Sequence, residues 1–399
     1  MDIDRNKSIL VSSDHHANWE ALEKLFQLAH KEGIPFVING DVVGDYNFEF
    51  LAEKLELKFP YEIEEEFFAQ EFDMREYRTY EYVERSGGNV DSLLHNVSPQ
   101  HKSEARKQIE IIMDKFDNPE TLKRIADIKE KVTPLVDEHK YKLRALYATI
   151  IKEHAQRLAA YIDKYNVPVY FLLGNHEPVY FIDFVKHYLT NKDLFTDIGS
   201  ARGILTLHDI NIVGVSNVNA IMPFLSDIYT DKEIDMLFCH QRGERNLLHG
   251  NVTLKTLSHV PKLTEDQDWI RVVKNGSKPD IDIFLSHGQI GRGAWRSNKF
   301  ADEVPTLAIA ATFSHIAHLT IDGHLHTSHE MKNSLGKQTI RAVGNEGYII
   351  SKDANKNITY EKVSVDAPYN ARGGLSFEDL DFQQKVMEEA QAHFSVSFP

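Results

Sequence analysis

Several short apolar runs in this chain end in a small cluster of acidic, amide or imidazole side chains, and this arrangement limits the possible folds. Short apolar runs bounded by polar residues are typical of buried strands. Groups at the ends of such strands meet at a common edge in α/β folds, even when they are far apart in sequence. The pattern therefore predicts an α/β fold with a functional site at its strand ends. In chain order the clusters are Asp14-x-His16, Gly40-Asp41, Gly174-Asn175-His176-Glu177, His287-Gly288 and Gly323-His324-x-His326.

The elements between these clusters indicate how many layers the fold has. Residues 9–13 and 35–39 predict buried strands, and residues 19–30 predict an amphipathic helix between them. This strand-helix-strand order favours an α/β fold. Many short strands follow later in the chain, which indicates two packed sheets rather than a single open one. These later strands are predicted at residues 167–173, 204–207, 210–215, 281–285, 318–321 and 338–343.

The segment 46–136 interrupts this pattern with long, charge-rich helical stretches, and we interpret it as an inserted helical cap. Within it, Asn118 and Pro119 predict the start of a helix, because asparagine caps helices and proline fits their first position. The predicted domains are a discontinuous catalytic core at 1–45 and 137–366, the cap at 46–136, and a C-terminal tail at 367–399. A helix is expected in the tail over residues 376–393, which begins with the capping pattern Ser376-x-x-Asp379.

Composition narrows the class of protein and of partner. With 42% hydrophobic and 26% charged residues, the chain resembles ordinary folded proteins. A formal net charge of -15 repels polyanions, so no nucleic acid partner is expected. The only cysteine is Cys239, which suits a reducing cytoplasm. The N-terminus has no Sec signal pattern and no long apolar stretch occurs, so we expect no membrane span.

The residue types in the clusters favour a pair of divalent metal ions. Aspartate oxygens with histidine nitrogens suit Mn first, with Fe or Zn as alternatives. Asp41 is the natural bridging ligand, because its two oxygens allow one carboxylate to bind both ions. A hydroxide shared by the two ions would form near neutral pH and attack phosphorus. His176 is then suited to donate to the leaving oxygen.

The ordered clusters resemble the calcineurin-like metallophosphoesterase superfamily, whose pattern is D-x-H, G-D, G-N-H-[DE], H and G-H-x-H. The resemblance implies an αββα sandwich, metal-dependent hydrolysis of phosphoric esters, and His176 as catalytic acid or transition-state donor. It also implies that Glu177 orients the His176 ring and that Asp41 bridges the metals. One metal would be bound by Asp14, His16 and His326, and the other by Asn175, His287 and His324.

Departures from the family pattern bear on the substrate. The Asp-Arg pair of typical serine/threonine protein phosphatases does not follow Gly40-Asp41, so Arg292 and Arg296 are considered as alternative phosphate ligands. The final Gly-His-x-His resembles the branch with nucleases, cyclic nucleotide phosphodiesterases and small-molecule phosphatases. We expect a phosphomonoesterase acting on phosphoprotein. The alternatives are a phosphodiesterase, nuclease or nucleotide phosphatase, or an interaction module that retains a relic metal site.

The position of the helical insertion resembles the Wip-type bacterial effector phosphatases, which carry a helical hairpin there and act on phosphotyrosine. An effector would be exported by a route other than Sec. The acidic C-terminal helix is compatible with such a secretion signal, but fits a plain solvated helix better. His15 lies between two expected ligands, and its side chain should point away from them in an extended segment.

Overall fold

The computed structural model describes residues 7–44, 46–94, 97–198, 205–215, 224–237, 281–287, 317–324, 326–332, 338–353, 355–367 and 380–394. Contacts divide the chain into two compact units. The first unit contains Met1–Leu51 and Leu146–Glu389, and the second contains Ala52–Ala145 and Ala390–Pro399. Among the helices described, none has the length and apolar character needed to cross a membrane.

One six-stranded sheet of the first unit is built around the N-terminal strand β1. Strands β1 to β4 run parallel, β11 pairs antiparallel with β1, and β12 pairs antiparallel with β11. All four parallel strands therefore end at the same edge. In spatial order the sheet contains β12 (Ile358–Ser364), β11 (Glu346–Lys352), β1 (Ser8–Ser12), β2 (Phe36–Asn39), β3 (Val169–Leu172) and β4 (Phe195–Asp197).

The second six-stranded sheet has four parallel strands flanked by two antiparallel ones. Strands β6, β7, β8 and β10 run parallel, while β5 and β9 pair antiparallel at the two edges. Its order is β5 (Leu205–Leu207), β6 (Ile210–Val215), β7 (Ile283–Ser286), β8 (Leu319–Ile321), β10 (Gln338–Arg341) and β9 (His329–Lys332).

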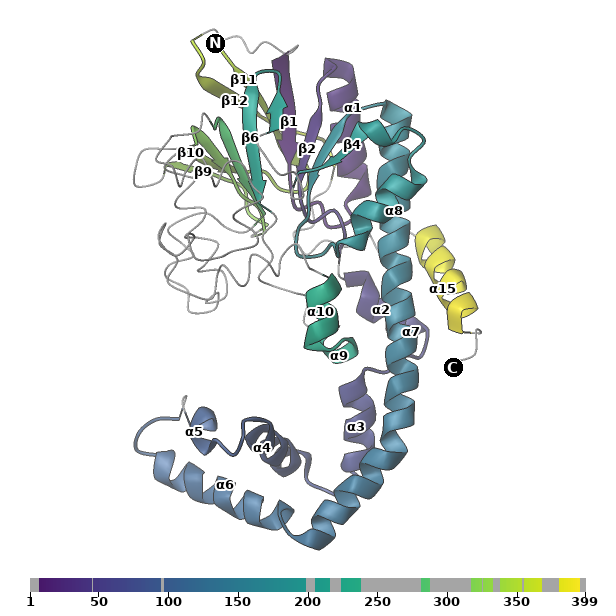
Figure 1. Ribbon diagram of the computed structural model, residues 1–399, viewed down its shortest axis with the longest axis vertical. Helices are drawn as coiled ribbons and strands as arrows, with labels where there is room; N and C mark the ends of the chain where they lie inside the picture. Colours follow the sequence, from purple (N-terminus) through teal and green to yellow (C-terminus); the bar gives the residue numbers. More distant parts are fainter. Residues whose placement is uncertain are drawn as a thin grey trace. The chain divides into compact units, whose positions relative to one another are not determined.

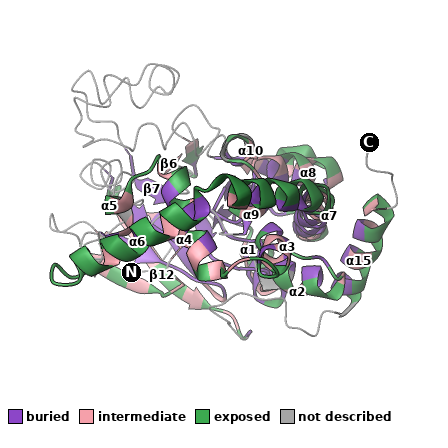
Figure 2. Cartoon of the chain, turned by 90° about the horizontal axis from the view of Figure 1, so that it is seen from below, coloured by how far each residue is buried: buried purple, intermediate pink, exposed green. Residues whose placement is uncertain are grey.

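The two sheets pack face to face through a shared apolar core, and Figure 2 colours the buried residues purple. Alternate residues of β1, Ile9 and Val11, join this core together with Leu285 of β7. The opposite face of the first sheet is covered by α1 (Trp19–Glu32), where the ring centroids of Phe26 and Phe36 are 5.2 Å apart (Figure 1). Because β1 is buried on both faces, it reads as a continuous apolar run rather than an alternating one.

The ends of α1 in the first unit are set by capping residues. The Oδ1 of Asn18 accepts a hydrogen bond from the N–H of Ala21 at the start of α1, and Gly33 ends the helix with a φ of 65°. The remaining helices of this unit are α8 (Tyr180–Tyr188), α9 (Leu225–Ile228), α10 (Asp231–Leu237), most of α15 (Leu380–Phe394) and the C-terminal part of α7 (Pro119–Tyr165). The helix α2 (Tyr46–Lys54) begins in the first unit and ends in the second.

The second unit is helical and has its own apolar core. That core includes Phe68, Tyr77 and Phe116, and the rings of Phe68 and Tyr77 stack with centroids 4.2 Å apart. The start of α7 at Pro119 is as predicted, because the Oδ1 of Asn118 accepts the N–H of Thr121 at 2.9 Å. Its other helices are α3 (Pro60–Phe68), α4 (Met74–Arg85), α5 (Val90–Leu93) and α6 (Lys102–Phe116).

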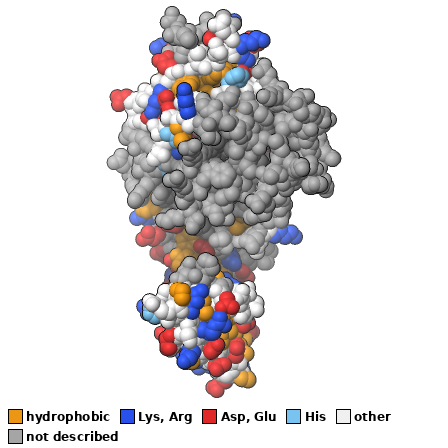
Figure 3. Space-filling model, turned by 90° about the vertical axis from the view of Figure 1, so that its left-hand side faces the viewer, with side chains coloured by type: hydrophobic (Ala, Val, Ile, Leu, Met, Phe, Trp, Pro, Cys, Tyr) orange, Lys and Arg blue, Asp and Glu red, His pale blue; other side chains and the backbone are white. Residues whose placement is uncertain are grey.

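Charged side chains on the second unit pair with charges of the opposite sign. Arg78 pairs with Glu65, and Arg124 with Glu71. Lys115 likewise pairs with Glu76. Figure 3 shows acidic and basic side chains interspersed on the face it presents. Exposed pairs of this kind each contribute about 0 to 1 kcal/mol of stability, so their main effect is to keep this surface from carrying one sign of charge.

The predicted two-sheet α/β sandwich is confirmed, although four strands were not anticipated. The runs predicted at 9–13, 35–39 and 167–173 form β1, β2 and β3. The missed strands are β4, β9, β11 and β12. Of these, β4, β9 and β12 lie at sheet edges, and in β9 and β12 exposed polar residues weaken the apolar pattern. The C-terminal helix begins at Leu380, and the predicted capping pair Ser376 and Asp379 lies outside the described residues.

Candidate metal centre

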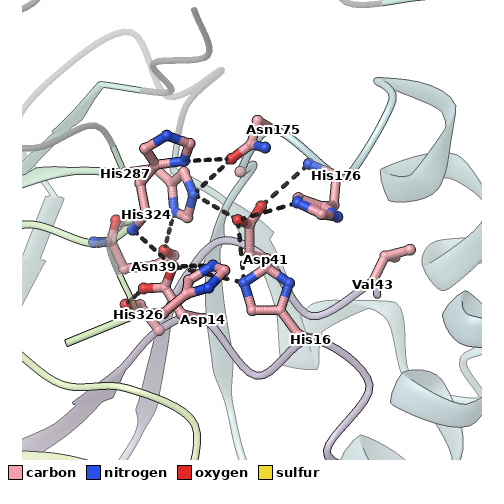
Figure 4. Close-up of polar contacts among 12 residues, drawn as sticks. Asp14, His16, Asn39, Asp41, Val43, Asn175, His176, His287, His324 and His326 are labelled. Atoms are coloured by element: carbon pink, nitrogen blue, oxygen red, sulfur yellow. Dashed lines mark hydrogen bonds and ion pairs between the residues drawn. The ribbon is translucent and has the colours of Figure 1, made fainter. Parts of the chain in front are cut away.

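The carboxyl ends of the parallel strands from both sheets bring the predicted ligands together (Figure 4). From the first sheet, β1 leads into Asp14 and His16, β2 into Asp41, and β3 into Asn175. From the second sheet, β7 leads directly into His287, and β8 leads into the loop with His324 and His326. Both sheets therefore contribute side chains to one site.

The first ligand cluster contains Asp14, His16, Asp41 and His326, each of which offers a donor atom within 4.8 Å of the others. The Nε2 of His16 lies 3.6 Å from the Oδ2 of Asp41 and 3.9 Å from the Oδ1 of Asp14. The Nε2 of His326 lies 4.0 Å from the Oδ1 of Asp14. Asp14, His16 and Asp41 are buried, whereas the His326 side chain is 30% exposed.

The second cluster contains Asp41 again, with His287 and His324. The Nε2 of His287 lies 2.9 Å from the Oδ2 of Asp41. The Oδ1 of Asn175 lies 3.2 Å from the Nε2 of His287 and 2.8 Å from the Nδ1 of His324, so the amide of Asn175 faces the same space. Since Asp41 belongs to both clusters, the residues form a candidate site for two divalent ions, and their oxygen and nitrogen donors fit such ions.

Electrostatics keep the two ligand carboxylates, those of Asp14 and Asp41, ionised. Burial alone would raise the pKa of Asp41, but the charge of His287 holds it well below its usual value. Burial alone would raise the pKa of Asp14, but the hydrogen bond to His16 and the charges of His287 and His16 together lower it to about 2. Burial would lower the pKa of His287, yet the Asp41 carboxylate raises it to about 10. In the metal-free protein, a proton on His287 thus supplies positive charge beside this pair of carboxylates.

The backbone of the site is held in conformations that most residues avoid. The φ angles are 55° at Asp14, 45° at His16, 54° at Asp41, 71° at His324 and 48° at His326. Each left-handed residue other than glycine costs about 1 to 3 kcal/mol and persists only when the surroundings fix it. Hydrogen bonds between the loops after β1 and β2 provide such fixation. The N–H of residue 14 donates to the carbonyl of residue 40 at 3.1 Å, and that of residue 16 to the carbonyl of residue 41 at 2.8 Å.

The glycines of two clusters are required by close contact between loops. A Cβ on Gly174 would overlap the Oδ1 of Asp41 and lie 2.5 Å from its backbone nitrogen. A Cβ on Gly40 would lie 2.7 Å from the Cα of Gly174 and 2.6 Å from the Nδ1 of His287. Distances this short do not occur for real Cβ atoms, so the loops after β2 and β3 could not approach with larger residues there.

His176 lies at the edge of the site beside Asp41. The ring Nε2 of His176 is 3.8 Å from the Oδ2 of Asp41. The main-chain N–H of His176 donates a hydrogen bond to the Oδ1 of Asp41 at 3.1 Å. Burial lowers the pKa of its imidazole to about 3, despite the opposing effect of Asp41. The ring is therefore neutral near pH 7, and carries one N–H that can donate a hydrogen bond.

Glu177 occupies a different position from the one expected on the family resemblance. It is fully buried, and its carboxylate accepts three main-chain hydrogen bonds, from Asp41 at 3.0 Å, Gly174 at 2.9 Å and Val43 at 2.8 Å. Among the described residues, the Nδ1 of His176 has no hydrogen-bond partner. The carboxylate of Glu177 therefore joins the loop after β2 to the loop after β3, rather than bonding to the His176 ring.

Two further polar residues support the ligands and were not recognised in the sequence. The carbonyl oxygen of Asn39 lies 2.8 Å from the Nδ1 of His287, which directs the Nε2 of that ring toward Asp41. The hydroxyl of Ser13 donates to the Oδ2 of Asp14. Ser13 has a signal in the sequence, a polar residue after an otherwise apolar strand, whereas the contact of Asn39 uses its main-chain carbonyl and has none.

Of the three remaining residues considered in the sequence, the structure describes only His15. His15 is buried, and its Nε2 lies 2.7 Å from the hydroxyl oxygen of Ser12, so it belongs to neither ligand cluster. Arg292 and Arg296 lie outside the described residues.

Replacing Glu177 with Gln should destabilise the protein by about 2 to 4 kcal/mol, because one amide group cannot accept all three main-chain hydrogen bonds. Urea unfolding measures this loss. Glu153→Gln is a matched control, since Glu153 is also buried but its carboxylate pairs with the side chain of Lys385. Equal losses in the two variants would contradict the proposed joining of the loops.

The raised pKa of His287 predicts how stability depends on pH when metals are removed. A group whose pKa is raised on folding stabilises the protein fully below its unfolded value of 6.5, and loses that effect as the pH rises through about 10. In EDTA, the free energy of unfolding should therefore fall between pH 6.5 and 10, and fall less in His287→Gln. Urea unfolding across this pH range tests this. Parallel curves for the two proteins would show that His287 carries no such proton.

Part of the chain matches the sequence model of a known family. Residues 135–328, which include the clusters from Gly174 to His326, match the family described as Calcineurin-like phosphoesterase. No curated protein matches the chain significantly. One crystal structure has 12% sequence identity and a TM-score of 0.40, covering 90% of this chain and 99% of the other. A dimetal phosphatase from Danio rerio has 10% identity and a TM-score of 0.33, covering 90% and 98%. Over residues 135–328 the chain is similar to the calcineurin-like phosphoesterases, and this match together with the two ligand clusters identifies it as a metal-dependent hydrolase of phosphoric esters.

Proposed function

We propose that this enzyme is a two-metal phosphomonoesterase that acts on phosphoprotein. The observation that carries the proposal is the shared Asp41, whose carboxylate belongs to two adjacent ligand clusters. Asp14, His16 and His326 would hold one ion, and Asn175, His287 and His324 the other. When bound, two such ions, with Mn proposed first, neutralise the phosphoryl group and activate water as the nucleophile.

The residues of the chain then have separate tasks. Asp41 would hold both ions, and its own position is fixed by the main-chain bonds that Glu177 accepts. His176 would donate its N–H to the leaving oxygen, which suits an imidazole that is neutral near pH 7. Arg292 and Arg296, which follow β7 in sequence, are proposed as further phosphate ligands.

Charge supports a protein substrate over a nucleic acid. The net charge of -15 repels a polyanion, and basic side chains such as Arg78 and Lys115 on the helical unit pair with acidic neighbours. We propose that residues 46–136 form a cap that selects the substrate, that residues 1–45 and 137–366 form the catalytic core, and that residues 367–399 form a tail. We propose a cytoplasmic location, with export as an effector by a route other than Sec as the alternative.

The alternative function is a phosphodiesterase, nuclease or nucleotide phosphatase. The feature that favours it is Gly323-His324-x-His326, which provides one histidine to each ligand cluster. A basic channel for nucleic acid would make binding strongly dependent on salt.

Hydrolysis of p-nitrophenyl phosphate and bis-p-nitrophenyl phosphate in the presence of Mn²⁺ separates the two functions. We expect the monoester to be preferred, and His176→Ala to lower kcat by about 10²- to 10⁴-fold, because a positioned donor to the leaving oxygen is lost. Phosphotyrosine and phosphoserine peptides would then be compared as substrates. Preference for the diester would instead support the alternative function.

Asp41→Asn should reduce turnover to background and weaken the binding of both ions, because a neutral amide is a poor bridging ligand. Mn²⁺ titration and steady-state kinetics measure the two effects. Asp282→Asn provides the control, since Asp282 is equally buried but precedes β7 at the end opposite to His287. Full turnover in Asp41→Asn would overturn the bridging assignment.

A further inference from the structure

A buried ion pair lies at the base of the loop that carries His324 and His326. Arg341, the last residue of β10, is 1% exposed, and Asp322, directly after β8, is fully buried. The Nε of Arg341 donates to the Oδ1 of Asp322 at 2.8 Å, and its Nη2 donates to the Oδ2 at 2.8 Å. The guanidinium thus binds both oxygens, and Asp322 belongs to neither ligand cluster although it lies two residues before His324.

The same guanidinium also reaches the chain after the loop. Its Nη1 lies 3.5 Å from the carbonyl oxygen of Thr327, a long hydrogen bond. Arg341 is directly opposite His329 in the pairing of β10 with β9, and the Nε2 of His329 lies 3.6 Å from the Oδ1 of Asp322. One side chain therefore contacts both the residue where the loop begins and the segment where it ends.

The loop requires such support because of its backbone conformation. The φ angles of His324 and His326 are both positive, at 71° and 48°, and each costs about 1 to 3 kcal/mol. At the start of the loop, the N–H of Asp322 donates to the carbonyl of Ile340, and the N–H of His324 donates to the Oδ1 of Asp14. These bonds lie in the first half of the loop, whereas the return toward β9 is contacted by the Nη1 of Arg341 at Thr327 and by the Nζ of Lys362 at the hydroxyl of Ser328.

Net stability does not account well for a buried pair of this kind. Removing two charges from water costs about as much as their attraction returns, so apolar residues of similar volume are often equally stabilising. A fork with two parallel hydrogen bonds does, however, fix direction closely. The benefit of Arg341 is therefore expected in the geometry of the loop rather than in the stability of the core.

We propose that Arg341 is a positioning residue for metal binding, which sets the orientation of His324 and His326 through Asp322 and Thr327. Because these histidines belong to different ligand clusters, Arg341 affects both ions together. This inference depends on the two-metal function proposed above.

The test removes the pair without leaving a buried charge. Arg341→Met alone would strand the Asp322 carboxylate and endanger folding. The double variant Arg341→Met with Asp322→Val removes one positive and one negative charge, so the net charge near the metal site is unchanged. The matched control is Lys352→Met with Asp282→Val. That pair, at 2.8 Å, is also largely buried but lies at the start of β7, opposite to the end that leads into His287.

Mn²⁺ binding is measured by calorimetry, and the coupling between two bound ions by electron paramagnetic resonance. We expect the Arg341 and Asp322 double variant to bind both ions about tenfold or more weakly and to lose the coupled spectrum, as is usual when residues that orient ligands are removed. The control should bind like the wild type. Unchanged binding in the test variant, or an equal loss in both double variants, would overturn the positioning role.

Two further comparisons complete the test. A wild-type protein that binds no Mn²⁺ pair would refute the two-metal function itself, whereas normal wild-type binding with an unaffected double variant refutes only the inference about Arg341. If the double variant fails to fold, Arg341→Lys serves in its place, since it keeps the charge but not the fork. Wild-type Mn²⁺ affinity in Arg341→Lys would also overturn the proposal.

Discussion

The buried carboxylate of Asp41 imposes the main constraint on this fold. A charge without solvent is costly unless a partner of opposite charge and hydrogen-bond donors surround it. Here the charged partner is the Nε2 of His287, which follows a strand of the other sheet and lies 2.9 Å from the Asp41 carboxylate. The hydrogen-bond donor is the main-chain N–H of His176. The ends of β2, β3 and β7 must therefore approach closely, which in turn explains why residues 40 and 174 are glycines.

Each acidic residue of the site also joins two loops through main-chain N–H groups. Asp14 accepts from His324 of the second sheet, Asp41 accepts from His176, and Glu177 accepts from three residues in two loops. Ligand orientation is thereby tied to the backbone, whose strained φ angles persist because several bonds fix them together.

The sequence predicted the metal-ligand residues of this site better than the residues that hold those ligands in position. Asp14, Asp41 and His287 could be anticipated, because each follows an apolar run that forms a buried parallel strand. The part played by Glu177 could not, since its acceptance of bonds from Asp41 and Val43 links positions more than 130 residues apart. The pairing of Arg341 with Asp322 was equally hidden, because an arginine in a strand pattern usually indicates a solvent-facing position. Edge strands such as β12 were missed for the related reason that half-exposed residues lack a regular apolar pattern.

Exposure within the site indicates from which side a substrate can reach it. Asp14, His16 and Asp41, from the first sheet, are almost fully buried, whereas the side chain of His326 is 30% exposed. The loops after β1 and β2 therefore form the closed wall of the site. His326, in the loop after β8, is the most exposed of these ligands, and this loop begins at the Asp322 and Arg341 pair. A residue that sets the shape of this loop consequently acts at the point where the metal ligands and the incoming phosphoryl group meet.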